Sequence, residues 1–268
     1  MSDLLQGLLD DLAAEGDQLR ETVLRLGPDG WTRPTPAPGW TVATQVAHLL
    51  WTDDVAVVAA HSHESSEAKQ AWDDVVLAAI DDPMGYVDQG AFELAARPRD
   101  EVLERWSASR AGLRQALTEL PAGQKMPWFG PPMSAASMAT ARFMETWAHA
   151  LDVYDAAGER PAPTDRIRHV AHLGVRTRNF AYSVHEEAPP AEEFRVELAA
   201  PSGELWSWGP EDAAQAVRGP AYDFCLLVTQ RVNRADTDLE AVGDDAEHWL
   251  GIAQAFAGPP GPGREAGA

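Results

Sequence analysis

The sequence has a single cysteine, Cys225, among its 268 residues. One cysteine cannot form an intramolecular disulfide, and it cannot assemble a zinc site that needs several thiolates. Any thiol chemistry that the protein carries out therefore needs a thiol from outside, unless Cys225 itself supplies it.

Basic residues are also few, because 21 Lys and Arg residues stand against 42 Asp and Glu residues, which gives a formal net charge of −21. Such an acidic chain is poorly suited to nucleic acid or to an anionic membrane surface, since both carry negative charge. We expect a small molecule as the partner, and neither a nucleic acid nor a membrane. The sequence does not determine the oligomeric state.

Long apolar runs are absent as well. No stretch approaches the roughly 18 apolar residues that a membrane-spanning helix requires. The first residues, Met1–Leu5, lack the basic segment typical of a signal peptide. We therefore expect a cytoplasmic protein.

The first part of the chain has the periodicity of amphipathic helices, with apolar residues at every third or fourth position. Stretches rich in Gly and Pro separate these segments. The predicted helices span residues 2–26, 40–57, 66–80, 99–120 and 134–158, with Thr41 as an N-cap and Gly158 at a C-terminus. Loops are expected at 27–39, 81–85 and 121–132. Long helices joined by loops are typical of a four-helix bundle.

The pattern changes after Pro163. Residues 164–184 are still predicted to be helical, but residues 193–198 alternate charged and apolar side chains, as in a half-buried strand. A turn at 201–203 and a strand at 204–208 complete a predicted hairpin. Further strands are expected at 215–218 and 239–242, and helices at 221–232 and 244–256.

These patterns predict an α+β protein with two domains. Residues 1–160 form the helical bundle, and residues 161–257 form a smaller α+β domain. Residues 258–268 are rich in Gly and Pro and are expected to be a flexible tail.

The predicted helix at 134–158 carries a candidate pair of metal ligands. Glu145 and His149 are four residues apart, so both side chains leave one helix face about 5 to 6 Å apart at Cβ. A carboxylate and an imidazole at this spacing can bind one metal ion. The same spacing is common on solvated helices, so the pair alone does not establish a site.

Among the eight histidines, His48 has the most unusual surroundings. It lies in the middle of a predicted helix between apolar neighbours, where a neutral imidazole needs a polar partner. Its own sequence is compatible with a core histidine or with a ligand. The others, apart from His149, lie in polar or charged stretches. His61, His63, His185 and His248 are expected at the surface, and His169 and His172 on a solvated or interdomain basic face.

Two segments, Pro36–Leu49 and Glu145–Asp152, resemble the N-terminal four-helix metal-binding domain of the DinB/YfiT-like superfamily. The branch they resemble is that of the mycothiol-dependent maleylpyruvate isomerases. The segments Gly219–Leu227 and Asp238–Asp244 are similar to the second domain of that branch. The tryptophan-rich hairpin and the tail look like a sister group known as metal-binding proteins, so the resemblance implies the fold and the metal site more specifically than the substrate.

The resemblance implies that His48, Glu145 and His149 are the metal ligands. Two imidazoles and one carboxylate leave a fourth position open for water or substrate, as in catalytic zinc sites, and the same ligands are also compatible with Ni²⁺ or Fe²⁺. Asp152, one turn beyond His149, either orients a ligand imidazole or is an exposed helical aspartate. Arg142, one turn before Glu145, either holds an anionic group or makes a surface ion pair.

The resemblance also implies an arginine of the second domain that assists catalysis. The candidates are Arg231 and Arg234. Arg231 is preferred because it stays on the predicted helix 221–232.

From this resemblance we expect a metal-dependent enzyme that uses mycothiol or a similar low-molecular-weight thiol for transfer or isomerisation on a small electrophilic metabolite. A metal dication favours the thiolate form of such a thiol. Two alternatives stay open. The site could serve a thiol-independent hydrolase, lyase or cyclase, or the protein could be a non-enzymatic metal or thiol sensor.

Overall fold

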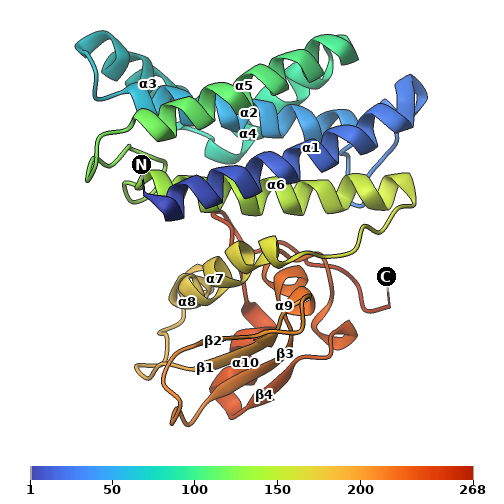
Figure 1. Ribbon diagram of the computed structural model, residues 1–268, viewed down its shortest axis with the longest axis vertical. Coiled ribbons are helices and arrows are strands. Elements are labelled where there is room, and N and C mark those ends of the chain that lie inside the picture. Colours follow the sequence, from blue (N-terminus) through green and yellow to red (C-terminus); the bar gives the residue numbers. More distant parts are fainter. Residues whose placement is uncertain (1, 268) are drawn as a thin grey trace. The chain divides into compact units, whose positions relative to one another are not determined.

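The computed structural model describes residues 2–267. The chain divides into two compact units, Met1–Pro161 and Ala162–Ala268. The first is a helical bundle and the second is a smaller α+β unit (Figure 1), so the predicted α+β class is confirmed. No helix within residues 2–267 is both long enough and apolar enough to cross a membrane.

Four long helices make the bundle, namely α1 (Asp3–Trp31), α2 (Val42–His61), α5 (Arg99–Glu119) and α6 (Ala135–Ala157). Helix α1 packs along α6, and α2 packs against both α5 and α6 (Figure 1). Their apolar stripes meet in two buried clusters, one around Leu113 and Leu117 and one around Leu49 and Trp106. The bundle therefore holds α2 and α6 side by side.

The ends of these helices follow local sequence signals. Thr41 caps α2, since its hydroxyl accepts from the Thr44 backbone at 3.3 Å and its own backbone N–H donates to the Thr44 hydroxyl at 3.5 Å. Gly158 ends α6 in the left-handed conformation, at φ 70°. Gly27, at φ 66°, interrupts α1, and only a short helical turn follows it.

Two further helices, α3 (Ser66–Ala79) and α4 (Pro83–Ala95), pack on α2. Helix α4 corrects the prediction of a loop at 81–85. The Asp82 side chain accepts from the Gly85 backbone at 2.9 Å, and Pro83 takes the first helical position, where proline is well tolerated. Gly90 lets α4 approach α2, because a Cβ there would lie 2.3 Å from Nε1 of Trp51.

The second unit is built on a four-stranded sheet of order β2-β1-β3-β4. The strands are β1 (Arg195–Ala199), β2 (Leu205–Trp208), β3 (Ala216–Pro220) and β4 (Glu240–Val242). β1 pairs antiparallel with β2 in the predicted hairpin, and it pairs parallel with β3, which pairs antiparallel with β4.

The helices of the second unit are short. A 3₁₀ turn at Asp165–Ile167 leads into α7 (Arg168–Arg176) and α8 (Arg178–Val184), and a second one lies at Arg234–Asp236. After β3 comes α9 (Ala221–Val228), and α10 (Asp244–Ile252) follows β4. Ring contacts of Trp249 with Phe194 and with Phe224, both at 5.8 Å, mark the core of this unit.

Helix α9 ends four residues earlier than predicted. The N–H of Arg231 bonds to the Leu226 carbonyl at 2.8 Å, and the N–H of Gln230 bonds to the Leu227 carbonyl at 2.9 Å. Gln230 itself adopts φ 58°. This is the Schellman arrangement that ends many helices, and glycine usually takes the left-handed position. A glutamine stands there instead, so the end of the helix could not be predicted.

The residues after Phe256 form neither helix nor strand within the part that the structure describes. Their backbone contacts the loop after α9, since Asn233 donates to the Arg264 carbonyl at 2.8 Å and the Gly267 N–H donates to Asp236 at 2.7 Å.

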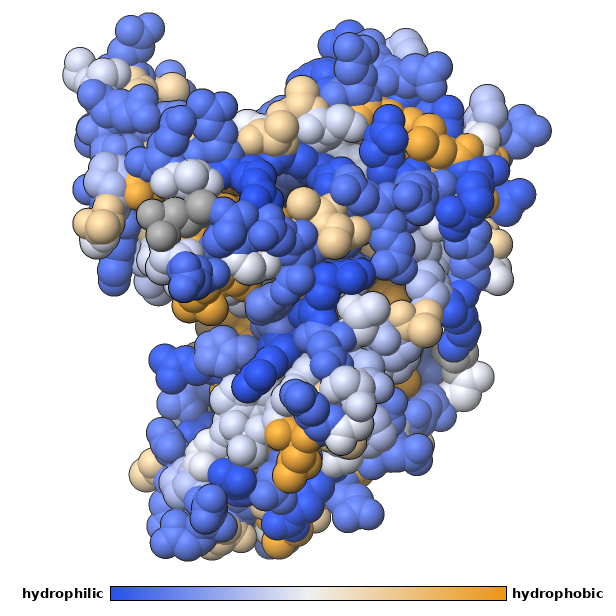
Figure 2. All heavy atoms as spheres, in the orientation of Figure 1, coloured by the Kyte–Doolittle hydropathy of each residue, from blue (hydrophilic) through white to orange (hydrophobic). Residues whose placement is uncertain are grey.

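The visible surface agrees with the acidic composition. The face in Figure 2 is covered mainly by hydrophilic residues, with small hydrophobic areas between them. The large hydrophobic side chains that are well exposed include Leu77 of α3 and Ile80, the residue that follows this helix.

Candidate metal centre

Helices α2 and α6 carry polar side chains along the line where they touch, although most of their neighbours are apolar. We call this set of residues the α2–α6 seam. It consists of Gln45, His48 and Asp53 from α2 and of Arg142, Glu145, His149 and Asp152 from α6.

The centre of the seam brings together the three residues that the sequence analysis singled out. Nε2 of His48 lies 3.4 Å from Oε2 of Glu145, and Nε2 of His149 lies 3.3 Å from the same oxygen. Among the described residues, only these three form a cluster of His, Cys, Asp or Glu that could hold a metal ion, with all ligand atoms within 4.8 Å of one another.

The spacing fits a tetrahedral metal site. Zinc binds imidazole nitrogen and carboxylate oxygen at about 2.0–2.1 Å, so two ligands of a regular tetrahedron lie about 3.3–3.4 Å apart. The observed contacts to Glu145, 3.3 and 3.4 Å, match that separation. A charge-assisted hydrogen bond would be shorter, at about 2.7–2.9 Å.

The carboxylate at this centre is held in its ionised form. Burial alone would raise the pKa of Glu145, but the adjacent imidazoles of His149 and His48 hold that pKa well below the usual value. An ionised carboxylate is the form that binds a metal ion.

Aromatic rings cover the imidazoles. Trp40, just before α2, stacks on His149 with ring centres 5.7 Å apart and planes inclined by 22°. Its centre lies 5.5 Å from that of His48, and Phe92 of α4 meets it edge-on at 6.2 Å. The indole therefore forms an apolar wall on one side of the centre. Trp40 lies within the sequence motif, but its contact with the two imidazoles was not predicted.

Gln45 contacts the far side of the His149 ring, and Asp152 in turn contacts Gln45. Asp152 is 1% exposed, so the alternative of an exposed helical aspartate is wrong. Its Oδ2 accepts from Nε2 of Gln45 at 3.4 Å, and Oε1 of Gln45 accepts from Nδ1 of His149 in a short hydrogen bond. Gln45 was missed from the sequence, although it lies one helical turn before His48.

Comparison with known proteins places this centre in a family. The model of the family described as "Mycothiol maleylpyruvate isomerase N-terminal domain" matches residues 12–154, which include all three clustered residues. The chain belongs to this family. A second model, described as "Wyosine base formation", matches residues 190–241, where the sheet lies.

Two relatives match this chain over almost its whole length. Two proteins of Mycobacterium tuberculosis, from strain CDC 1551 / Oshkosh and strain H37Rv, are each 56% identical to this chain over 254 residues. The match covers 95% of this chain and 96% of each relative, and both relatives bear the name uncharacterized protein.

Solved structures share the fold over both units. The mycothiol-dependent maleylpyruvate isomerase and a histidine-to-alanine mutant of it match with TM-scores of 0.55 and 0.58, at 15% identity. Each match covers 90% of this chain and 95% of the other chain. At this identity the likeness establishes the fold.

In this member of the family, Arg142 makes a buried ion pair, so the expected surface pair is corrected. Its Nε donates to Oδ1 of Asp53 at 2.8 Å, and the two side chains are 3% and 5% exposed. The partner was not foreseen, because Asp53 lies 89 residues earlier on α2. Burial raises the pKa of Asp53, although the charge and hydrogen bond of Arg142 lower it.

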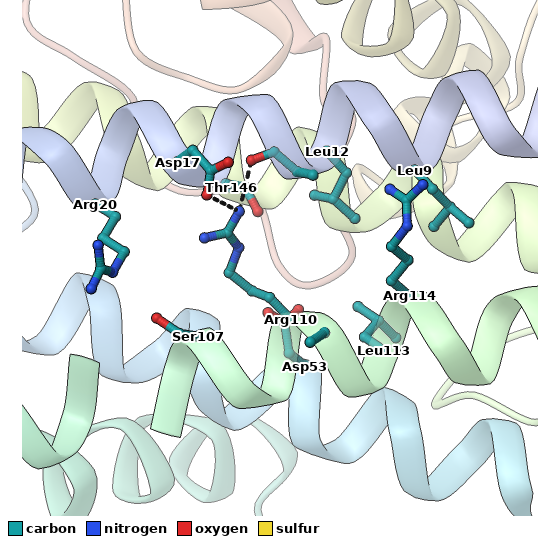
Figure 3. Close-up of a pocket in the computed structure, with 12 residues that line it drawn as sticks. Leu9, Leu12, Asp17, Arg20, Asp53, Ser107, Arg110, Leu113, Arg114 and Thr146 are labelled. Atoms are coloured by element: carbon teal, nitrogen blue, oxygen red, sulfur yellow. Dashed lines mark hydrogen bonds and ion pairs between the residues drawn. The ribbon is translucent and has the colours of Figure 1, made fainter. Parts of the chain in front are cut away.

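The bundle also contains a cavity of about 450 Å³ between α1 and α5 (Figure 3). Arg110 crosses it from α5, donating to the Ala13 carbonyl at 2.7 Å and to Asp17 at 2.9 Å. Asp53 and Thr146 of α2 and α6 also line it, whereas the three clustered residues do not. The cavity and the candidate metal centre are therefore different places in the bundle.

The two candidate arginines, Arg231 and Arg234, lie beyond the end of α9, so the reason for preferring Arg231 was wrong. Arg231 donates from Nη1 to the Thr229 carbonyl at 2.7 Å. Arg234 is engaged with Glu247 at 3.0 Å and with the Thr237 hydroxyl at 3.1 Å. Both arginines stay candidates, and each is hydrogen-bonded within its own unit.

The lone cysteine is shielded. Cys225 is 0% exposed, and its Sγ donates to the Ile167 carbonyl at 3.4 Å. Burial raises the pKa of this thiol well above its ordinary value, so it resists forming the thiolate that acts as a nucleophile.

Proposed function

We propose that the protein is a metal-dependent enzyme that uses a low-molecular-weight thiol, mycothiol or a similar molecule, for transfer or isomerisation on a small electrophilic metabolite. The observation that carries the metal site is the convergence of His48, Glu145 and His149 with spacings that fit a tetrahedron. Zn²⁺ suits these ligands best, and Ni²⁺ or Fe²⁺ also fits the donor set.

The chain's own residues would share the work as follows. His48, Glu145 and His149 would hold the metal, and three protein ligands leave a position open for another molecule. A bound dication favours the deprotonated form of a sulfur ligand. Trp40 would limit water around the two imidazoles.

Use of an external thiol is supported by two independent points. The family is described by a mycothiol-dependent activity. The chain's own thiol, at Cys225, is buried and resists ionisation. We further propose that Arg231 or Arg234 stabilises negative charge on the substrate. The net charge of −21 favours a small-molecule partner over a nucleic acid.

The metal site is tested by elemental analysis of the purified protein and three variants. His48→Ala and His149→Ala should each lose most of the bound metal. His61→Ala is the matched control, because His61 lies on the same helix but pairs with Glu64 in an exposed position. Full metal occupancy in both site variants would refute the assignment.

Thiol use is tested separately on the cobalt-substituted protein. Titration with mycothiol should produce a sulfur-to-metal charge-transfer band, and an S-methylated mycothiol should not. Maleylpyruvate is the first substrate to assay, with and without the thiol. A cobalt protein that gives no such band, or turnover that does not need the thiol, would instead favour a thiol-independent hydrolase, lyase or cyclase.

A further inference from the structure

The two histidines of the proposed metal site differ in what lies behind them. Nδ1 of His149 bonds to Oε1 of Gln45. Nδ1 of His48 is buried and has no hydrogen-bond partner among the described residues. The sequence makes the two rings look equivalent, whereas the structure gives only one of them this hydrogen bond.

The orientation of the Gln45 amide follows from its other neighbours. Its Nε2 lies 2.9 Å from the Thr35 hydroxyl and 3.4 Å from Oδ2 of Asp152. An ionised carboxylate only accepts hydrogen bonds. The Thr35 hydroxyl donates its single hydrogen to the Trp40 carbonyl at 3.2 Å, so it can only accept from Gln45.

A flipped amide would therefore place Oε1 against two acceptors. Gln45 is 0% exposed, so water cannot easily relieve that arrangement. The amide is thus fixed with its NH₂ group toward Asp152 and Thr35 and with its carbonyl oxygen toward His149. An acceptor at this place requires a proton on Nδ1 of His149, since a neutral imidazole carries one N–H.

We propose that Gln45 is a positioning residue that holds His149 in the Nδ1–H tautomer before any metal arrives. Asp152 and Thr35 act through it by fixing its amide. The lone pair of Nε2 then faces Glu145, 3.3 Å away, as a ligand must. His48 has no such partner and adjusts when the metal binds. The proposal rests on the metal site proposed above, but the tautomer itself exists without metal.

The first test uses the ¹⁵N-labelled metal-free protein. Long-range ¹H–¹⁵N correlation spectra of the imidazoles should show His149 as a single Nδ1–H tautomer at a pH where the ring is neutral. His48 should show the opposite, Nε2–H tautomer in the same spectrum, because its Nε2 lies against the Glu145 carboxylate and its Nδ1 has no partner, which makes it an internal control. A predominantly Nε2–H His149, or averaged shifts for it, would overturn the proposal.

The second test uses variants and chelator-competition titrations with Zn²⁺. Gln45→Leu removes the acceptor with little change in size, and it should average the His149 tautomers and weaken metal binding about 10- to 100-fold. In the double variant Gln45→Glu with Asp152→Asn, one carboxylate oxygen at position 45 accepts from His149. The new amide at position 152 donates to the other carboxylate oxygen. It should recover the Nδ1–H tautomer and most of the affinity.

The possible failures are distinguishable. An unchanged His149 tautomer in a folded Gln45→Leu variant overturns the role of Gln45. If that variant does not fold, the spectrum of the unmodified chain still decides the tautomer. A chain that binds no Zn²⁺, while His149 keeps its single tautomer, refutes the proposed metal site instead.

Discussion

Replacing Arg142 by methionine should destabilise the bundle strongly, although the side chain lies outside the proposed ligand set. Arg142→Met keeps an unbranched side chain of similar length but removes the cation that faces Asp53 at 2.8 Å. Both groups are almost fully buried. The variant would therefore leave an unpaired carboxylate inside the bundle, which is costlier than losing the pair itself.

The magnitude follows from the surroundings of Asp53. Breaking a buried pair by removing one partner costs about 3–5 kcal/mol. Asp53 also borders the cavity between α1 and α5, where water can partly solvate it, so we expect about 3 kcal/mol. For a unit of this size that corresponds to a fall in Tm of about 6–12 °C.

The loss should depend on pH in a defined direction. Burial already raises the pKa of Asp53, and removing Arg142 removes the main opposing effect. The unfolded chain ionises Asp53 near the ordinary value of 3.8. Because the folded state binds this proton more tightly, the stability of the variant should fall as pH rises through the raised pKa. The difference from the unmodified chain should thus be smaller at about pH 5 than at about pH 7.5.

The assay is urea unfolding followed by circular dichroism at both pH values. Arg114→Met is the matched control, because Arg114 forms a more exposed pair with Asp10, and the loss of this pair should change the stability little. The double variant Arg142→Met with Asp53→Leu removes both charges and should recover most of the stability. A loss below about 1 kcal/mol for the single variant, or no recovery in the double variant, would refute the reasoning.

Three further predictions concern other parts of the chain. Glu145→Gln should make the metal-free protein less sensitive to acid. The low pKa of Glu145 in the folded protein contributes stability above the ordinary value of 4.5, and this stability is lost as the pH falls through the folded pKa. Urea unfolding at several acidic pH values measures the effect, and equal acid sensitivity of the two proteins would contradict it. Cys225 should react with iodoacetamide only as fast as its unit unfolds, and mass spectrometry showing rapid labelling of the folded protein would contradict its burial. Gly209→Ala should cost about 1 kcal/mol or more of stability beyond the cost of Gly203→Ala. Both glycines have positive φ, but only a Cβ at Gly209 would meet a backbone oxygen, that of Phe194 at 2.0 Å. Thermal unfolding measures both variants, and equal losses would contradict this prediction.

Much of the helical unit could be predicted from local signals. Apolar stripes located its long helices, and the caps Thr41 and Gly158 marked two of their ends. Helix α4 was missed because Pro83 and Gly85 suggested a loop, whereas Pro83 occupies a first helical position. The end of α9 was missed because a glutamine, Gln230, adopts the conformation that usually signals itself by glycine.

The candidate metal centre could likewise be predicted only in part. His48, Glu145 and His149 were named from the motif pattern, and the structure brings them together. Their surroundings could not be predicted, since the partners of Arg142 and Gln45 come from the facing helix, about 90 to 110 residues away in the chain. Local sequence gives no signal for such contacts.

The α2–α6 seam also fixes how the two helices can move against each other. A slide of one helical turn displaces side chains by about 5.4 Å, and a one-residue shift rotates each by about 100°. Either movement would separate Asp53 from Arg142, His48 from Glu145 and Gln45 from Asp152 at the same time. Apolar contacts would tolerate a neighbouring alignment far better than these directional bonds. The groups proposed to bind the metal therefore also set the register of the helices that carry them, so a substitution that alters one is expected to disturb the other.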